Sequence, residues 1–328
     1  MKKLLLILAI LSGITCYGLQ AHAASIVSTG HQKYNYKEYL SDLAALQKKY
    51  PDYLQYKVIG SSADGRKLHD VVVGNPDAKK HLIVIANLHA REYITTQLTM
   101  AQIEYICKNY KKKINKKKVS STLDKVAIHF IPSADPDGTA ISQYGFGAIR
   151  SKSWRNKMKR TGASSTTWKA NARGVDLNRN WPISWAAGGS RGAMGYRGPS
   201  AASEPEVKAI IKDVNKIQKK GKIIGLISYH SMGCILYGRC ASQATSSVRS
   251  KTTRMYQLAQ KLTGYRLMPT ESISSAKGCS REYFLYKRHI PCITLEVGSS
   301  SSPVPISQFP SIWRKNKDIP IREAQILS

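Results

Sequence analysis

Apolar runs alternate along the chain with stretches in which apolar residues recur every three or four positions. Residues 35–49 show the helical spacing, which ends before Pro51. Four short, continuously apolar runs are typical of strands buried on both faces: 81–88, 126–132, 222–230 and 291–298. With helices between them, these runs predict an α/β fold, in which a single domain has a mostly parallel mixed β-sheet flanked by helices.

Further elements are predicted around these strands: two strands within 53–75, helices over 95–111, from about 203 and over 246–263, and a last helix that closes the chain. The sequence from Asp135 to Gly138 is typical of a turn. Residues 139–200 are rich in Gly, Ser, Arg and Trp and only weakly periodic. An irregular stretch of this length inside one domain favours a functional loop.

The first 23 residues have the pattern of a secretory signal peptide. Lys2 and Lys3 precede a short apolar stretch, and the small residues around His22 predict cleavage after Ala23. A lipid anchor on Cys16 is the alternative, which the preceding threonine disfavours. No later segment is long and apolar enough to cross a bilayer. We therefore expect residues 24–328 to form a secreted, extracellular protein with no membrane span.

Cleavage would leave five cysteines, an odd number, so at least one thiol is unpaired or bonded to another molecule. Cys234 could pair with Cys240, and Cys279 with Cys292, but the sequence does not fix the connectivity. Buried free thiols are the alternative.

The formal charge of +31 is unusual. It favours electrostatic association with an anionic partner, such as a cell-wall polymer. The densest basic run, residues 108–118, is more typical of a solvated helix end and loop. No nucleic-acid-binding motif accompanies the charge, so we expect no nucleic-acid partner.

Three residues that can bind a metal stand at the ends of predicted strands. His89 and Glu92 follow the run at 81–88, and His230 ends the run at 222–230. The carboxyl ends of strands in an open α/β sheet are where ligand sites form. Two histidines and one glutamate are the ligands of a catalytic zinc that keeps one position open for water. The sequence therefore predicts a site for one Zn²⁺.

Glu296 ends a third apolar strand at the same predicted edge of the sheet. A glutamate buried there is costly unless it is paired or has a chemical role. Hydrolysis needs a general base beside the metal-activated water, and Glu296 is the candidate.

Three motifs carry a resemblance to a known family: HAREY at 89–93, GVDLNRNW at 174–181 and the pair Trp154-Arg155. They resemble the zinc carboxypeptidases of the carboxypeptidase A type, over about residues 35–315. The resemblance implies a carboxypeptidase A-like fold with catalytic Glu296 and Arg155, and substrate-binding Arg91, Asn178 and Arg179. In that family Asn178 and Arg179 would grip a substrate carboxylate, Arg155 would stabilise the oxyanion, and Asp176 would orient His89.

The chain departs from the pancreatic members of the family in the region that selects the substrate. An ungapped count back from Glu296 puts Ser274 where those members carry a mobile tyrosine, and Met232 also replaces a tyrosine. The same count puts Arg281 at the position that selects the last side chain. An arginine there favours a carboxylate, although local pairing with Glu282 is the alternative.

Three further segments resemble the bacterial cell-wall branch of the family: 230–238, 278–284 and 295–309. Members of that branch cut γ-D-glutamyl-meso-diaminopimelate bonds in peptidoglycan peptides. The resemblance implies a secreted zinc metallopeptidase that acts on peptidoglycan stem peptides. The alternative is a secreted metallocarboxypeptidase that trims C-terminal residues, acidic ones included, from proteins or peptides. A non-catalytic wall-binding protein on a peptidase scaffold is the rival from another class.

Overall fold

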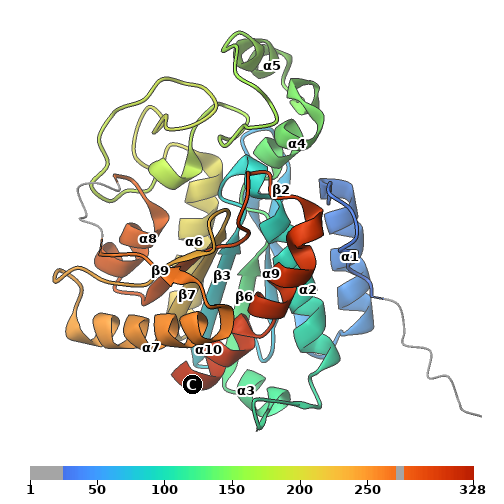
Figure 1. Cartoon of the computed structure of the whole chain (residues 1–328), viewed down its shortest axis with the longest axis vertical. Coiled ribbons are helices and arrows are strands. Elements are labelled where there is room, and N and C mark those ends of the chain that lie inside the picture. Colours follow the sequence, from blue (N-terminus) through green and yellow to red (C-terminus); the bar gives the residue numbers. More distant parts are fainter. Residues whose placement is uncertain (1–24, 271–276) are drawn as a thin grey trace, which may run out of the picture.

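Eight strands form one mixed sheet in the order β1-β2-β6-β3-β7-β10-β8-β9 (Figure 1). The computed structural model describes residues 25–270 and 277–328, so the predicted signal peptide, Cys16 and Ser274 lie outside the described residues. The strands of the sheet are β1 Leu54–Ser61, β2 Lys67–Val73, β3 Lys80–Ala86, β6 Val126–Ile131, β7 Lys222–His230, β8 Ile235–Tyr237, β9 Arg266–Leu267 and β10 Cys292–Glu296. The four central strands β6, β3, β7 and β10 are mutually parallel, and β1, β2 and β8 pair antiparallel. The predicted mostly parallel mixed sheet is confirmed.

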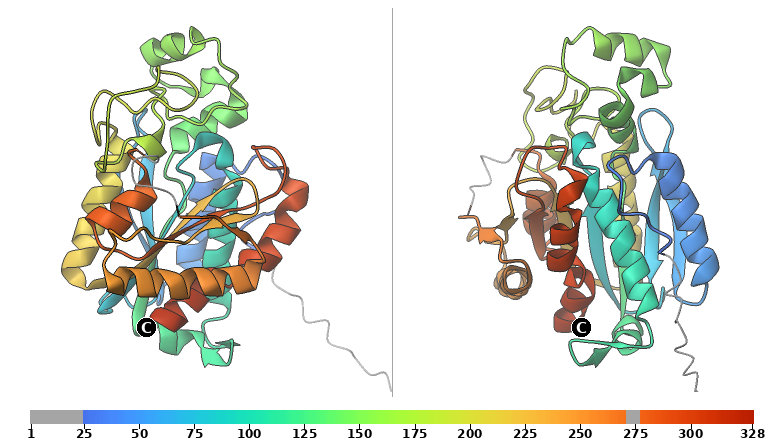
Figure 2. Two further views of the ribbon diagram at one scale, coloured as in Figure 1. Left: turned by 60° about the vertical axis from the view of Figure 1, so that its left-hand side comes forward. Right: turned by 45° about the vertical axis from the view of Figure 1, so that its right-hand side comes forward.

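Helices cover both faces of this sheet. In chain order they are α1 Tyr36–Lys49, α2 Ile94–Lys108, α3 Val119–Leu123, α4 Pro136–Tyr144, α5 Lys152–Lys159, α6 Pro205–Lys220, α7 Ser246–Thr263, α8 Ser280–Glu282, α9 Phe309–Asn316 and α10 Ile319–Leu327. Single turns add η1 Ala90–Glu92, η2 Phe146–Ala148, η3 Leu177–Arg179, η4 Tyr283–Lys287 and η5 Ile306–Gln308. Helices α1, α2 and α9 lie on one side of the sheet and α6 on the other (Figures 1 and 2).

Strand β3 shows why the central runs are apolar at every position. Leu82 and Val84 point into the core formed with α1 and α2, whereas Ile83 and Ile85 point into the core formed with α6. Successive side chains of a strand face opposite ways, so a strand with helices on both sides needs apolar residues throughout.

The strand register aligns the ends of the central strands. Ala86 of β3 is paired with Tyr229 of β7, and His230 of β7 is paired with Glu296 of β10. Because the strands are parallel, their carboxyl ends meet at one edge of the sheet. The segment that contains α4 and α5 extends beyond this edge (Figure 1).

Most predicted elements are confirmed, with the expected uncertainty at their ends. The helix over 246–263 and the strand over 222–230 have the predicted bounds, and the helix from residue 94 ends at Lys108 rather than 111. The basic run 108–118 begins at the end of α2 and includes an exposed hairpin, formed by β4 Lys113–Ile114 and β5 Lys117–Lys118. The closing helix is two helices, α9 and α10. No helix within 25–270 or 277–328 is long and apolar enough to cross a membrane.

The turn predicted at Asp135 to Gly138 is wrong. These residues begin α4, where the Asp135 side chain accepts a hydrogen bond from Gly138 N at 2.9 Å and Pro136 occupies the first turn. Asp and Pro are favoured in turns and also at helix starts, because both satisfy or remove unpaired backbone N–H groups. The stretch 139–200 therefore contains the rest of α4 and all of α5 as well as loops.

A buried histidine makes stability sensitive to acid. Burial lowers the pKa of His69 on β2 to about 4, and Tyr39 Oη lies 3.2 Å from its Nδ1. The folded protein thus keeps this ring neutral, while the unfolded chain takes up a proton below about pH 6.5. The stabilising contribution is complete above pH 6.5 and is lost as the pH falls towards 4.

We therefore expect the stability advantage of the wild type over His69→Gln to shrink by about 2 kcal/mol between pH 7 and pH 4. Urea unfolding of both proteins at several pH values measures this difference. A difference that stays constant across the range would show that His69 takes up its proton equally well in the folded state.

Candidate metal centre and active site

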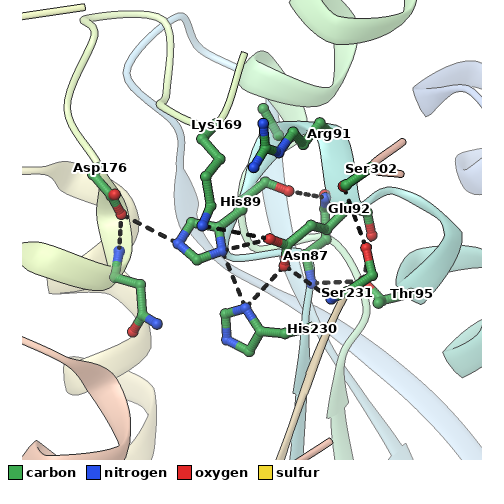
Figure 3. A network of polar contacts seen from close by, with 12 residues as sticks. Asn87, His89, Arg91, Glu92, Thr95, Lys169, Asp176, His230, Ser231 and Ser302 are labelled. Atoms are coloured by element: carbon green, nitrogen blue, oxygen red, sulfur yellow. Dashed lines mark hydrogen bonds and ion pairs between the residues drawn. The ribbon is translucent and has the colours of Figure 1, made fainter. Parts of the chain in front are cut away.

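Three buried side chains converge at the carboxyl edge of the sheet (Figure 3). His89 follows β3, Glu92 lies in the η1 turn that leads into α2, and His230 is the last residue of β7. Glu92 Oε1 is 2.9 Å from His89 Nδ1, and Glu92 Oε2 is 2.9 Å from His230 Nδ1. The two Nδ1 atoms lie 3.1 Å apart.

This cluster has the donor chemistry of a zinc site. One ligand atom from each of His89, Glu92 and His230 lies within 4.8 Å of the other two. Burial would raise the pKa of Glu92, but His89 and His230 hold it well below its usual range, so the carboxylate is ionised. Two imidazole nitrogens that face each other around one carboxylate can be satisfied together by a shared cation. The residues fit one Zn²⁺ and leave a coordination position for water.

Asp176 lies next to His89, the residue that the family resemblance expects it to orient. Its Oδ1 lies 3.2 Å from His89 Nε2, on the side of the ring opposite to Glu92 (Figure 3). Burial would raise the pKa of Asp176, but the neighbouring His89 outweighs this effect and lowers it. Asp176 also accepts a hydrogen bond from Gly195 N at 3.1 Å. A carboxylate in this position fixes the orientation of the ring and leaves Nδ1 for the metal.

Glu296 lies beside His230, because the two residues are paired between β10 and β7. Burial, reinforced by the negative charge of Glu92, raises the pKa of Glu296 to about 8, against the opposing effects of His89 and Lys169. A bound dication would lower that pKa, because it stabilises the carboxylate. The site thus places a proton acceptor at the rim of the metal cluster.

A cavity of about 240 Å³ opens beside the cluster. Of the residues that the structure describes, it is lined by His89, Lys169, Asn178, Arg179, His230, Tyr237, Cys279, Arg281, Glu282, Thr294 and Glu296. The predicted carboxylate-binding residues Asn178, Arg179 and Arg281 are therefore in one cavity with the predicted base. They come from η3 and α8, which are about a hundred residues apart in the chain.

Two predicted residues are not brought to this cavity. Arg91 directs Nη1 to the carbonyl of Thr167 at 3.2 Å, and Arg155 is half-buried on α5. Neither is among the described residues that line the cavity. Their roles in substrate binding and oxyanion stabilisation stay predictions.

Lys169 is a residue of the site that the sequence did not predict. It lines the cavity, and its Nζ lies 3.8 Å from Glu92 Oε1 (Figure 3). Its neighbours in the sequence carry no recognisable motif, and it lies in the irregular stretch 139–200. Only the folding of this stretch over the sheet edge brings Lys169 to the metal cluster.

The five cysteines within the described residues are free thiols. Neither of the two pairs that the spacing allowed is formed. Cys279 lies instead in the cavity wall, where its Sγ is 3.6 Å from Asn178 Oδ1. Cys107 and Cys292 are buried among apolar residues. The alternative of buried free thiols therefore holds for these two.

The comparison with known families decides the assignment of this site. Residues 39–319 match the family model described as zinc carboxypeptidase. The chain is a member of the zinc carboxypeptidase family. This zinc carboxypeptidase is accordingly a zinc metallopeptidase that uses one zinc ion, and His89, Glu92 and His230 are the candidate ligands in its structure.

Two relatives of this chain carry names of different activities. It is 26% identical to gamma-D-glutamyl-L-diamino acid endopeptidase 1 of Lysinibacillus sphaericus, over 87% of this chain and 71% of that one. It is 28% identical to metallocarboxypeptidase A of Trichophyton rubrum, over 77% of this chain and 60% of that one. The chain thus spans less than two thirds of the fungal enzyme.

Solved structures share the fold. Carboxypeptidase A from Helicoverpa armigera has a TM-score of 0.69 at 18% identity and covers 94% of this chain and 78% of its own. A murein-tripeptide amidase from Escherichia coli O157 has a TM-score of 0.52 at 18% identity, over 86% of this chain and 94% of its own. The predicted carboxypeptidase A-like architecture is confirmed.

Proposed function

We propose that this zinc metallopeptidase is secreted and hydrolyses γ-D-glutamyl-diaminopimelate bonds in peptidoglycan stem peptides. The observation that carries the proposal is the cavity in which Arg179 and Arg281 lie together with Glu296. Two guanidinium groups suit a leaving residue with two carboxylates, one on its main chain and one on its side chain. Diaminopimelate has both. The endopeptidase relative from Lysinibacillus sphaericus supports the same substrate class.

The chain's own residues would divide the reaction as follows. Zinc, when bound, supplies Lewis-acid polarisation of the carbonyl and a water of lowered pKa. Glu296 accepts the proton of that water and passes it to the leaving amine. Asn178 and Arg179 hold the main-chain carboxylate of the leaving residue. Asp176 keeps the His89 ring in place while charge changes beside it.

The developing oxyanion requires a cation. The family resemblance assigns this role to Arg155, which would have to extend from α5 into the cavity when substrate binds. Lys169 already lines the cavity and is the second candidate. In either case, a positive charge aimed at the oxyanion acts where little water screens it.

Secretion and wall association are the second part of the proposal. The signal-like segment at 1–23 would direct export, and the formal charge of +31 would hold the enzyme at anionic wall polymers. Binding to purified walls should then weaken as salt is raised, because exposed charges are screened.

Mass spectrometry of peptidoglycan digested by the purified enzyme tests the substrate. We expect products cut between γ-D-glutamate and diaminopimelate, and none in a digest by Glu296→Gln. An acidic-ended linear peptide, assayed in parallel, tests the second candidate function, carboxypeptidase trimming, which the fungal relatives favour. Faster cleavage of that peptide than of the stem peptide would reject the wall assignment.

A further inference from the structure

Two opposite charges lie side by side in the wall of the substrate cavity. Arg281 and Glu282, both on α8, are 5% and 2% exposed, and both line the cavity. Arg281 Nη1 lies 3.2 Å from Glu282 Oε1. The local pairing of Arg281 with Glu282 is therefore present, and Arg281 also lines the cavity, while its selection of a carboxylate stays a prediction.

Two polar atoms of the pair have no hydrogen-bond partner among the described residues. Arg281 donates Nη2 to the carbonyl of Arg239, but its Nε has no hydrogen-bond partner among the described residues. Glu282 Oε2 has no partner of hydrogen-bond geometry within that part of the chain, although the buried Cys279 thiol lies close to the carboxylate. Buried polar atoms without partners are rare in folded proteins and call for an explanation. A ligand that brings both a donor and an acceptor into the cavity would supply one.

The pair also lies close to β10, the strand that ends at Glu296. Thr294 and Glu296 both line the cavity, as expected of alternate residues on one face of a strand. Cys292 is the next residue in this series. Burial raises the pKa of the Cys292 thiol. The positive charge of Arg281 lowers that pKa and the negative charge of Glu282 raises it further, so both charges are close to Cys292. Cys292 and Glu296 are four residues apart, which is roughly 13 Å along a strand, so a substrate side chain that extends from Glu296 towards Cys292 has to be long.

Charge balance decides which side chain the pair prefers. A lone buried arginine selects an anion, but a carboxylate beside it cancels much of that field and attracts a cation. A side chain that ends in a carboxylate alone would approach Glu282 unfavourably. A side chain that ends in an ammonium alone would approach Arg281 unfavourably. A side chain that ends in both an ammonium and a carboxylate would be attracted to Glu282 through the first and to Arg281 through the second.

We propose that Glu282 is a specificity-determining residue that accepts the side-chain ammonium group of the substrate, while Arg281 donates to the adjacent carboxylate. The pocket would thus recognise a complete amino-acid head group at the end of a long side chain. This inference rests on the proposed function and deepens it, because it replaces selection of an acidic side chain by selection of a dipolar one.

Three matched peptides test the proposal, each with L-alanyl-γ-D-glutamate before the scissile bond. The leaving residue is meso-diaminopimelate, 2-aminopimelate, which lacks the side-chain ammonium, or lysine, which lacks the side-chain carboxylate. We expect the zinc-loaded wild type to have a kcat/KM for the first peptide at least about tenfold above either of the others. Loss of one buried charge contact commonly has an effect of this size.

Variants assign the preference to its residues. Glu282→Gln is expected to bring the ratio of diaminopimelate to 2-aminopimelate close to one, and Arg281→Met to do the same for the ratio of diaminopimelate to lysine. Arg288→Gln is the matched control: Arg288 lies on the same segment but contacts Tyr283 and Gln218, and it should leave both ratios unchanged. Thermal unfolding shows whether each variant is folded.

The outcomes separate this inference from the function beneath it. Equal cleavage of the three peptides by the wild type would overturn the role of the pair and leave the proposed function standing. A folded Glu282→Gln that keeps the wild-type ratios would also overturn it. If that variant does not fold, the wild-type ratios alone decide. No cleavage of any of the three peptides would reject the proposed function and the inference together.

Discussion

Replacing Glu296 with glutamine is expected to lower kcat by about a thousandfold or more while the protein still binds one zinc ion. General acid–base groups contribute about 10²–10⁴-fold, and here one residue would serve as base and then as acid. Glutamine keeps the shape of the side chain but accepts no proton. Glu296 is the partner of His230 in the register of β10 and β7, so it lies next to a candidate zinc ligand without being one. The substitution therefore changes the chemistry beside the metal and leaves the three candidate ligands in place.

Stopped assays over hours measure the residual rate, and elemental analysis measures the zinc. The fold should tolerate the change, because burial already raises the pKa of Glu296 and disfavours its charged form. Asp318→Asn is a control beside α10, where the Asp318 side chain accepts a hydrogen bond from Tyr105 Oη at 2.8 Å and does not line the cavity formed by the described residues. A Glu296→Gln protein with an unchanged product yield would disprove its role as base.

Removal of zinc has the second large effect. Treatment with a chelator is expected to abolish hydrolysis and to lower the unfolding temperature by several degrees, and one equivalent of Zn²⁺ should restore both. A ligand that binds only the folded state at 1,000 times its Kd stabilises it by about 4 kcal/mol. The Nδ1 atoms of His89 and His230 lie 3.1 Å apart, and without the ion they lose the cation that would stabilise both.

Two variants grade this dependence. Glu92→Gln removes the carboxylate that lies 2.9 Å from both histidines and should leave the protein without stoichiometric zinc. Asp176→Asn leaves all three donors and removes only the charge behind His89, so zinc affinity should fall by about 10–100-fold. Competition with a chelating dye measures both affinities. Equal affinities in wild type and Glu92→Gln would show that Glu92 is not a ligand.

The position of the metal site could be predicted because it depends on strands. Continuous apolar runs mark strands buried on both faces, and parallel strands end at one edge. His89 follows such a run, and His230 and Glu296 lie at the ends of two others, so their meeting required only the correct register. The start of α4 was misread because Asp and Pro suit both turns and helix starts.

The substrate cavity depended on contacts that no local pattern encodes. Lys169 reaches Glu92 through an irregular segment, whose path is set by packing rather than by periodicity. Arg155 belongs to a recognised motif, yet α5 holds it outside the set of described residues that line the cavity. The sequence also left open whether Arg281 faces substrate or pairs with Glu282, and the fold brings about both.

The sequence by itself therefore determined the sheet and predicted candidate zinc donors and a candidate general base, because strand periodicity and residue chemistry are local properties. Only the tertiary structure decided which charges share the cavity and how they balance. Side chains from the segment after β3 and from η3, β7, α8 and β10 meet there, and a charge pair is defined by distance in space. For that reason the change from an acid-selecting arginine to a dipolar pair became visible only in the folded chain.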